Sequence, residues 1–131
     1  MDDKVIAVAT KFVGRPFQFG KFDCYKLVID WFKEFGYEVP DYKYDRFWYN
    51  SGGNFFLEEY HKLWRRLGPD EPHALHDVAL FKILAPVPNH VGICLGDGRF
   101  IHCAENTATV VSRLDKYKNV LHSIYRLRAV E

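Results

Sequence analysis

The sequence predicts an α+β fold in which N-terminal helices pack on a five- to six-stranded antiparallel sheet. Helical periodicity is confined to the first half of the chain, whereas short β-rich runs separated by turn signals fill the second half. Helices followed by hairpins favour an antiparallel sheet with the helices on one face. The chain has 131 residues, 48% of them hydrophobic, so we expect one domain over residues 1–131 with enough apolar material for a core.

Three segments have apolar residues at helical spacing, and we expect helices at residues 3–13, 24–35 and 54–67. In the second segment the apolar face is clear, and Gly36 marks its end. In the third segment aromatic and leucine side chains repeat at helical spacing up to Gly68, which predicts a helix that packs on the sheet.

Five β-rich runs follow the predicted helices. They span residues 78–83, 90–95, 99–104, 109–114 and 124–128. The second and third runs flank Gly96-Asp97-Gly98, a short hairpin loop with glycine where a positive φ is common. If this loop closes symmetrically, Leu95 lies opposite Arg99 and Gly92 lies opposite His102.

This register predicts a pair of histidines on one face of the sheet. Side chains alternate along a strand, so His90, Gly92 and Cys94 share a face with His102, and Cys103 points away. His90 and His102 become diagonal neighbours, roughly 7 Å apart at the backbone and within hydrogen-bond reach through their rings. Gly92 has no side chain, so we expect the space between the two rings to be open.

Cys24 is the candidate nucleophile because it falls at the first position of the second predicted helix. Asp23 is a good N-cap residue, and the positive end of a helix dipole favours a thiolate. A free cysteine has a pKa of about 8.5, and this position is expected to lower it. The charge of Asp23 opposes that effect, so activation needs a cationic partner, which a histidine can provide.

A single cysteine or histidine is more often a packing residue than a catalytic one. The combination of Cys24 with two histidines on one face reverses that balance, because it matches a nucleophile, a base and a group that orients the base. The residues therefore predict a cysteine hydrolase or acyltransferase.

Composition excludes several other classes of protein. The chain has 18 basic and 17 acidic residues and a net charge of +1, which gives no electrostatic basis for nucleic-acid binding. No apolar run approaches the length of a membrane span, and the acidic, amphipathic N-terminus is unlike a signal peptide. The chain has three cysteines, an odd number that cannot all pair in disulfides, which favours assembly in a reducing cytoplasm.

His73 and His76 are spaced to share a helix face, which raises the question of a metal site. Pro69 and Pro72 instead predict a loop, and no matching cysteine pair or acidic motif completes a ligand set. We expect neither a metal nor another cofactor. His73, His76 and His122 are expected to be solvated loop or terminal residues.

Five short motifs follow one another along the chain: Gly14-Arg-Pro-Phe17, Asp23-Cys24, Asp77-Val-Ala-Leu-Phe81, Asn89-His90-Val-Gly-Ile93 and Gly96-Asp-Gly-Arg-Phe-Ile-His102. Their order resembles the NlpC family of papain-like endopeptidases, which act on bacterial cell-wall peptides. The resemblance runs from about Val5 to Arg128. It implies a papain-like NlpC fold in which Cys24 is the nucleophile, His90 the general base and His102 the residue that orients the base.

The compact stretch from Phe19 to Tyr25 resembles the branch of this family found among tail-tip proteins of tailed phages. That resemblance implies a peptidoglycan stem peptide as substrate, cut at the γ-D-glutamyl to diamino-acid bond. It also implies other tail-tip proteins as partners and the virion tail as location, after assembly in the host cytoplasm. Phe17 departs from the family pattern, since a tyrosine hydroxyl that assists the oxyanion is usual there.

Two alternatives stay open at this level. The first is a structural tail-assembly protein that keeps a little-used or inactive peptidase fold, which the Phe17 departure favours. The second is an amidase or acyltransferase acting on a lipid or small molecule. The aromatic segment at residues 41–49 either lines a substrate cleft or contacts a neighbouring tail subunit.

Overall fold

The computed structural model describes residues 2–41, 62–85 and 88–131. Helices α1 (Asp3–Phe12) and α2 (Cys24–Glu34) come first. Six strands follow: β1 (Trp64–Arg66), β2 (Val78–Phe81), β3 (His90–Cys94), β4 (Arg99–Cys103), β5 (Thr109–Arg113) and β6 (Leu121–Leu127). Two short 3₁₀ helices, η1 (Leu114–Tyr117) and η2 (Arg128–Val130), flank β6. Most of the aromatic segment at residues 41–49, and residues 54–61 of the third predicted helix, lie outside the described residues.

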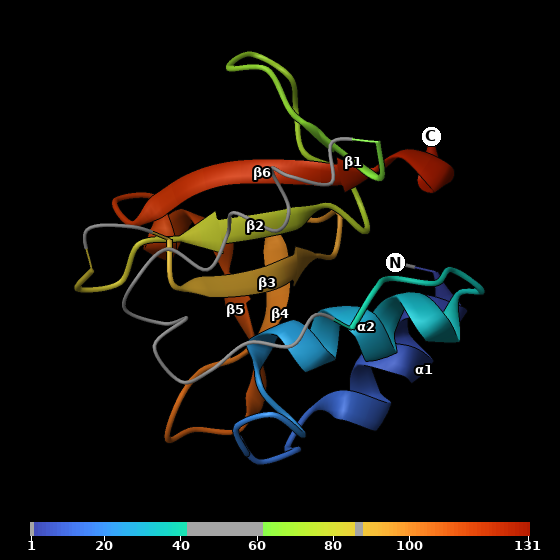
Figure 1. Ribbon diagram of the computed structural model, residues 1–131, viewed down its shortest axis with the longest axis vertical. Coiled ribbons are helices and arrows are strands. Elements are labelled where there is room, and N and C mark those ends of the chain that lie inside the picture. The colour runs from blue at the N-terminus through green and yellow to red at the C-terminus, as the bar shows by residue number, and fades with distance from the viewer. Residues whose placement is uncertain (1, 42–61, 86–87) are drawn as a thin grey trace.

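The strands form one sheet in the order β1-β6-β2-β3-β4-β5, and every neighbouring pair is antiparallel. Both helices lie on the same side of this sheet (Figure 1). The predicted α+β class, with N-terminal helices on a six-stranded antiparallel sheet, is therefore confirmed. Helices α1 and α2 and strands β2 to β5 begin and end close to their predicted positions, β6 begins earlier than predicted, and β1 was not predicted.

The end of the third predicted helix is wrong. Trp64 to Arg66 form β1, which pairs with β6 in the register Trp64↔Leu127 and Arg66↔Tyr125. Trp64 is fully buried against the main core while Arg66 is exposed. Trp64, which suggested helical spacing, thus belongs to a half-buried edge strand, and tertiary pairing overrides local periodicity.

Helix α2 is closed at both ends by local hydrogen bonds. At its start, the Asp23 side chain accepts a hydrogen bond from the backbone N–H of Lys26, as expected of an N-cap. At its end, Gly36 N–H donates to the Lys33 carbonyl and Tyr37 N–H donates to the Phe32 carbonyl, the pattern of a Schellman motif. The Phe32 and Tyr37 rings also meet edge to face, 6.4 Å between centroids. The Asp23 cap fixes where the helix begins, with Cys24 as its first residue, and the contacts of Gly36 and Tyr37 fix where it ends.

The β3–β4 hairpin has the predicted register. Gly92 pairs with His102, Cys94 pairs with Phe100, and Leu95 N–H donates to the Arg99 carbonyl at 2.9 Å. Gly96 and Gly98 in the loop both have φ of +87°, a conformation that glycine adopts without strain. His90 and His102 therefore lie on one face of the sheet, as the alternation of side chains predicted.

Two hydrophobic clusters cover the two faces of the sheet. The larger one joins α1 and α2 to inward residues of the strands such as Ile93, Ile101 and Cys103. The smaller one, on the other face, contains Ala79, Phe81, Cys94, Phe100 and Leu114 and is flanked by Tyr117 of η1. Cys94 and Cys103 therefore face opposite sides of the sheet, as predicted, and all three cysteines are buried.

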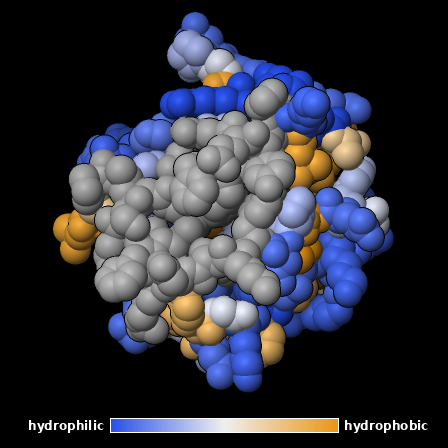
Figure 2. Space-filling view, viewed as in Figure 1, coloured by the Kyte–Doolittle hydropathy of each residue, from blue (hydrophilic) through white to orange (hydrophobic). Residues whose placement is uncertain are grey.

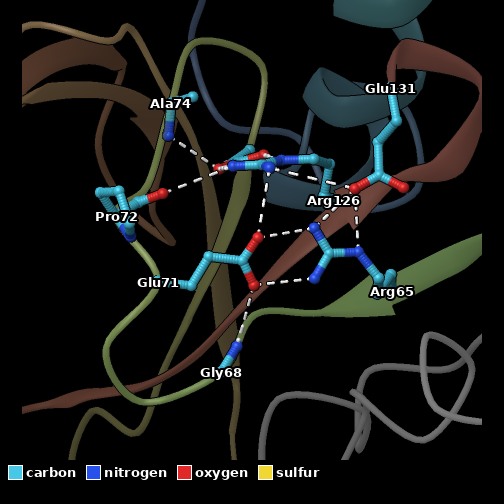
Figure 3. A network of polar contacts seen from close by, with 8 residues as sticks. Arg65, Gly68, Glu71, Pro72, Ala74, Arg126 and Glu131 are labelled. Carbon is cyan, nitrogen blue, oxygen red and sulfur yellow. Dashed lines mark hydrogen bonds and ion pairs between the residues drawn. The ribbon is translucent and has the colours of Figure 1, made fainter.

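A cluster of ion pairs fastens the segment before β2 to the sheet edge (Figure 3). Arg65 binds both Glu71, with contacts of 2.7 and 2.8 Å, and Glu131, with contacts of 2.5 and 2.8 Å. Arg126 donates two hydrogen bonds of 2.8 Å to the buried carboxylate of Asp77. The hydrogen bond from Arg65 is the main cause of a lowered pKa at Glu71. A buried Asp77 carboxylate requires this compensation, since an uncompensated buried charge is strongly destabilising.

The described surface is predominantly hydrophilic in Figure 2, with hydrophobic groups in small separate patches. Within the described residues, no helix combines the length and apolar character needed to cross a bilayer.

We predict that Gly92→Ala destabilises the fold. A Cβ at Gly92 would lie 2.6 Å from Cδ2 of Phe100, 3.1 Å from Cβ of His102 and 3.1 Å from the Ile101 carbonyl oxygen. Overpacking of this kind costs about 1–3 kcal/mol, measurable by urea unfolding. Gly68→Ala is the control because nothing lies within 4 Å of the position that its added methyl group would take, and it should stay within about 0.5 kcal/mol of the parent. Equal stability of both variants would contradict the tight packing at Gly92.

Candidate active site

Cys24 is the first residue of α2 and only 1% exposed. The preceding turn is held by Asp23, whose two carboxylate oxygens accept hydrogen bonds from the backbone N–H groups of Gly20 and Lys26, each at 2.9 Å. Asp23 itself is fully buried. This double contact explains why an acidic residue precedes the cysteine: it organises the backbone on both sides of Cys24.

The two predicted histidines are in direct contact. Nε2 of His90 lies 2.9 Å from Nδ1 of His102, and the rings meet edge to face with centroids 5.1 Å apart. His90 is 5% exposed and His102 is 3% exposed. The hydrogen bond within the pair, predicted from strand register alone, is confirmed.

The space beside Gly92 is filled, which corrects the expectation that it is open. The Phe100 ring occupies it and stacks on the His102 ring at 4.3 Å between centroids, with an interplanar angle of 26°. The Tyr117 and His102 rings meet edge to face with centroids 5.5 Å apart, and the centroids of the Phe81 and His90 rings are 5.8 Å apart. The absent side chain at Gly92 therefore admits an aromatic ring that fixes the orientation of the His102 imidazole.

Burial keeps both imidazoles neutral around pH 7. Desolvation lowers the pKa of His90 to about 3, with a further contribution from the neighbouring His102, and burial lowers the pKa of His102 to about 4. A neutral imidazole has one N–H donor and one acceptor nitrogen. Each ring can therefore donate at one nitrogen and accept at the other, which suits a pair that passes or holds a proton.

Helix α2, which begins at Cys24, packs on β3 and β4, the two strands that carry the histidines. In Figure 1 α2 runs alongside β3, and both begin at the same side of the view. Cys24 belongs to the larger core cluster, whereas the histidine rings contact Phe81, Phe100 and Tyr117 around the smaller one. His90 is the first residue of β3, so it lies at the end of the strand rather than in the middle of either layer.

Ser112 is a site residue that was not predicted from the sequence. It lies on β5, and its Oγ is 2.8 Å from Nε2 of His102, the nitrogen that does not face His90. The register Phe100↔Ser112 places it on the histidine face of the sheet. The alternation along residues 109–114 shows which side chains share a face. The contact with His102 could not be predicted from it without the length and register of the β4–β5 connection.

His76 is not a solvated loop residue, contrary to the expectation. Its Nδ1 accepts a hydrogen bond of 3.0 Å from Nε1 of Trp31, and its ring lies 4.5 Å from that of Phe35. Burial lowers its pKa. His76 has a φ of +76°, and its N–H donates to the Cys94 carbonyl, so the chain turns sharply here to place the ring on α2. His122 is exposed, as expected, but it lies in strand β6 rather than in a loop.

Phe17 is half-buried and packs against the larger core, and its backbone N–H donates to the Thr107 carbonyl at 2.8 Å. Across residues 2–41, 62–85 and 88–131, no group of three or more His, Cys, Asp or Glu side chains is arranged to hold a metal ion. An open pocket of about 610 Å³ lies beside Asp97 and Arg99 at the hairpin loop, the opposite end of β3 from His90, and so is separate from the histidine pair.

Comparison with known proteins agrees with this architecture. The model of the NlpC/P60 family matches residues 14–126. The tail tip assembly protein K of Escherichia phage lambda is 32% identical over 117 residues, covering 88% of this chain and 59% of that protein. The protein of the same name from Escherichia phage N15 is 34% identical over 91 residues, covering 67% of this chain and 37% of that protein. The chain thus spans little more than half the length of the lambda protein, and less of the N15 one.

Solved structures share the fold at low sequence identity. A Staphylococcus aureus protein of the NLP/P60 family, described as similar to lipoprotein, has a TM-score of 0.66 at 19% identity, covering 97% of this chain and 42% of that chain. The NlpC/p60 domain of the peptidoglycan hydrolase SagA has a TM-score of 0.62 at 17% identity, covering 95% of this chain and 97% of that chain. The peptidoglycan hydrolase RipB from Mycobacterium tuberculosis has a TM-score of 0.62 at 21% identity, covering 95% of this chain and 63% of that chain. With a family model that matches most of its length, the chain belongs to the NlpC/P60 family.

Proposed function

We propose that the protein is a cysteine peptidase that hydrolyses peptidoglycan stem peptides, with Cys24 as nucleophile, His90 as general base and His102 as the residue that orients His90. The observation that carries this proposal is the buried hydrogen bond of 2.9 Å between the two histidines, on strands that pack against the helix beginning at Cys24. Burying two imidazoles side by side costs stability, because each loses its hydration. A catalytic role accounts for that cost.

The chemistry follows from the proposed roles. His90 Nδ1 takes the proton of the Cys24 thiol, and the thiolate sulfur attacks the peptide carbonyl carbon to give a tetrahedral oxyanion. Backbone N–H groups at the start of a helix point outward, so the Cys24 N–H is the proposed first oxyanion donor. When the C–N bond breaks, His90 returns its proton to the leaving amine, and then it activates a water that hydrolyses the thioester and restores the thiol.

The substrate and setting are also proposals. Relatives named peptidoglycan hydrolases share the fold, and the relatives with higher identity are named tail tip assembly proteins. We therefore propose the γ-D-glutamyl to diamino-acid bond of the stem peptide as the substrate bond, other tail-tip proteins as partners, and the phage tail as the location. In this setting the enzyme opens the cell wall locally during infection.

We expect Cys24→Ala to abolish hydrolysis while the fold is retained, because only a sulfur is removed from a capped helix start. Purified peptidoglycan is digested and the products are analysed by mass spectrometry, where new free amino groups on the diamino acid report cleavage at the proposed bond. Cys103→Ala is the matched thiol control and should retain activity. Cleavage by Cys24→Ala at the parent rate rules out Cys24 as nucleophile. An intact substrate with the unmodified protein favours a structural tail-assembly role.

His90→Ala should lower kcat by about 100- to 10,000-fold, since it removes the proton carrier, and His102→Ala should cost less because it removes only an orienting group. His122→Ala, at an exposed histidine of β6, is the control and should leave kcat unchanged. A larger loss at His102 than at His90 would mean that the two roles are reversed.

The neutral histidine pair makes the fold sensitive to acid. The folded-state pKa values of His90 and His102 lie below the ordinary value of 6.5. The unfolded chain therefore binds more protons, and stability falls as the pH drops below about 6.5. We expect the free energy of unfolding to fall from pH 6.5 to 4.5, by up to about 1.4 kcal/mol per pH unit for each histidine.

His102→Asn should flatten this dependence in urea titrations at several pH values. Part of the slope should persist, because the pKa of His76 is lowered as well. The window ends at pH 4.5 because lowered carboxylate pKa values, such as that of Glu71, affect stability in stronger acid. A parent protein equally stable at pH 6.5 and 4.5 would show that the pair is not buried in the neutral form.

A further inference from the structure

The hydrogen-bonded pair of imidazoles continues to a third group, Ser112 of β5. Nε2 of His90 lies 2.9 Å from Nδ1 of His102, and Nε2 of His102 lies 2.8 Å from Oγ of Ser112. The three side chains come from three adjacent strands, β3, β4 and β5, so sheet pairing places them in a row. Both nitrogens of His102 are therefore in hydrogen bonds within the protein.

We propose that Ser112 is a positioning residue that accepts the Nε2–H of His102 and so sets which nitrogen of His90 is free to take a proton. This inference rests on the proposed function, because it concerns the base of that same reaction. Ser112 acts through His102 and does not touch the substrate.

Two proton arrangements are compatible with the distances. In the first, His90 Nε2–H donates to His102 Nδ1, and His102 Nε2–H donates to Ser112 Oγ. In the second, the Ser112 hydroxyl donates to His102 Nε2, and His102 Nδ1–H donates to His90 Nε2. The first arrangement leaves His90 Nδ1 with a lone pair, whereas the second leaves it carrying a proton. Only the first arrangement lets His90 accept the Cys24 proton at that atom.

The surroundings of Ser112 allow the first arrangement. His102 is 3% exposed, so its Nε2–H needs an acceptor within the protein, and the serine oxygen is at the right distance. Ser112 is only half-buried, so its own hydroxyl proton can point to solvent while its oxygen accepts. In this arrangement both nitrogens of His102 and the Nε2–H of His90 have hydrogen-bond partners within the protein.

The first arrangement also suits the charged intermediate. When His90 takes a proton at Nδ1, its Nε2–H still donates to His102, and His102 still donates to Ser112. No other proton has to move. The Phe100 ring stacked on His102 and the Tyr117 ring at its edge hold the imidazole plane, so both hydrogen bonds persist through the cycle.

The tautomers can be read directly by ¹⁵N NMR of histidine-labelled Cys24→Ala protein, which has no nucleophile. We expect His102 to be protonated at Nε2 and unprotonated at Nδ1, and His90 to be protonated at Nε2. Ser112→Ala should shift part of both populations toward the Nδ1–H forms. A His102 ring protonated at Nδ1 in the protein that retains Ser112 would show that the serine donates, and that result overturns the inference.

Kinetics on the protein with Cys24 intact give the second readout. Ser112→Ala should lower kcat by about three- to tenfold with little change in KM, which matches the loss of one ordinary hydrogen bond. Ser112→Thr keeps the hydroxyl and should restore most of the loss. Val110→Ala is the control, because Val110 lies directly opposite His102 in the register and has no hydrogen-bonding atom in its side chain. Equal kcat for Ser112→Ala and the parent overturns the inference.

The two readouts separate this inference from the proposed function. If no peptidoglycan is cut by the parent protein while the NMR shows the expected tautomers, the proposed function fails and the role of Ser112 in orienting the histidines stands. If peptidoglycan is cut but the tautomers do not respond to Ser112→Ala, the proposed function stands and the inference fails.

Discussion

The hydrogen bond between His90 and His102 is the interaction on which the rest of the site depends. It requires Gly92 opposite His102, a loop that closes between Leu95 and Arg99, and side chains that alternate without a bulge across β3 and β4. A slip of one residue would move a histidine to the other face of the sheet. The hairpin loop therefore affects the contact between His90 and His102 from the far end of the strands, because the loop sets the register.

Burial gives the same pair its chemical character. The aromatic rings around the histidines exclude water and hold both imidazoles neutral, which is the form that can accept a proton. Burial also narrows the choice of hydrogen-bond partners, since each nitrogen must find one inside the protein. The row from His90 through His102 to Ser112 is one solution to that requirement, and its outer end reaches solvent at a half-buried serine.

Most of the fold was predictable because its signals are local. The cap at Asp23 and the alternation in the hairpin each act over a few residues, so the start of α2 and the contact between the two histidines could be inferred from the sequence. Features that depend on distant pairing could not. Trp64 is a strand residue because β6 lies beside it, the Phe100 ring fills the space beside Gly92 from the neighbouring strand, and Ser112 contacts His102 only through the β4–β5 register. In each case the sequence does not show which residue of a neighbouring strand lies opposite a given position.

Strand β5 links the two halves of the proposed site. At its start, the backbone N–H and hydroxyl of Thr109 both donate to the Arg15 carbonyl, at 2.8 and 3.1 Å, and Gly14 N–H donates to the Thr109 carbonyl at 2.8 Å. These bonds anchor the segment that leads to Cys24. Three residues further along the same strand, Ser112 contacts His102. Because one short strand contacts both the segment before α2 and the end of the histidine row, it bears on the position of the proposed nucleophile and on the orientation of the proposed base.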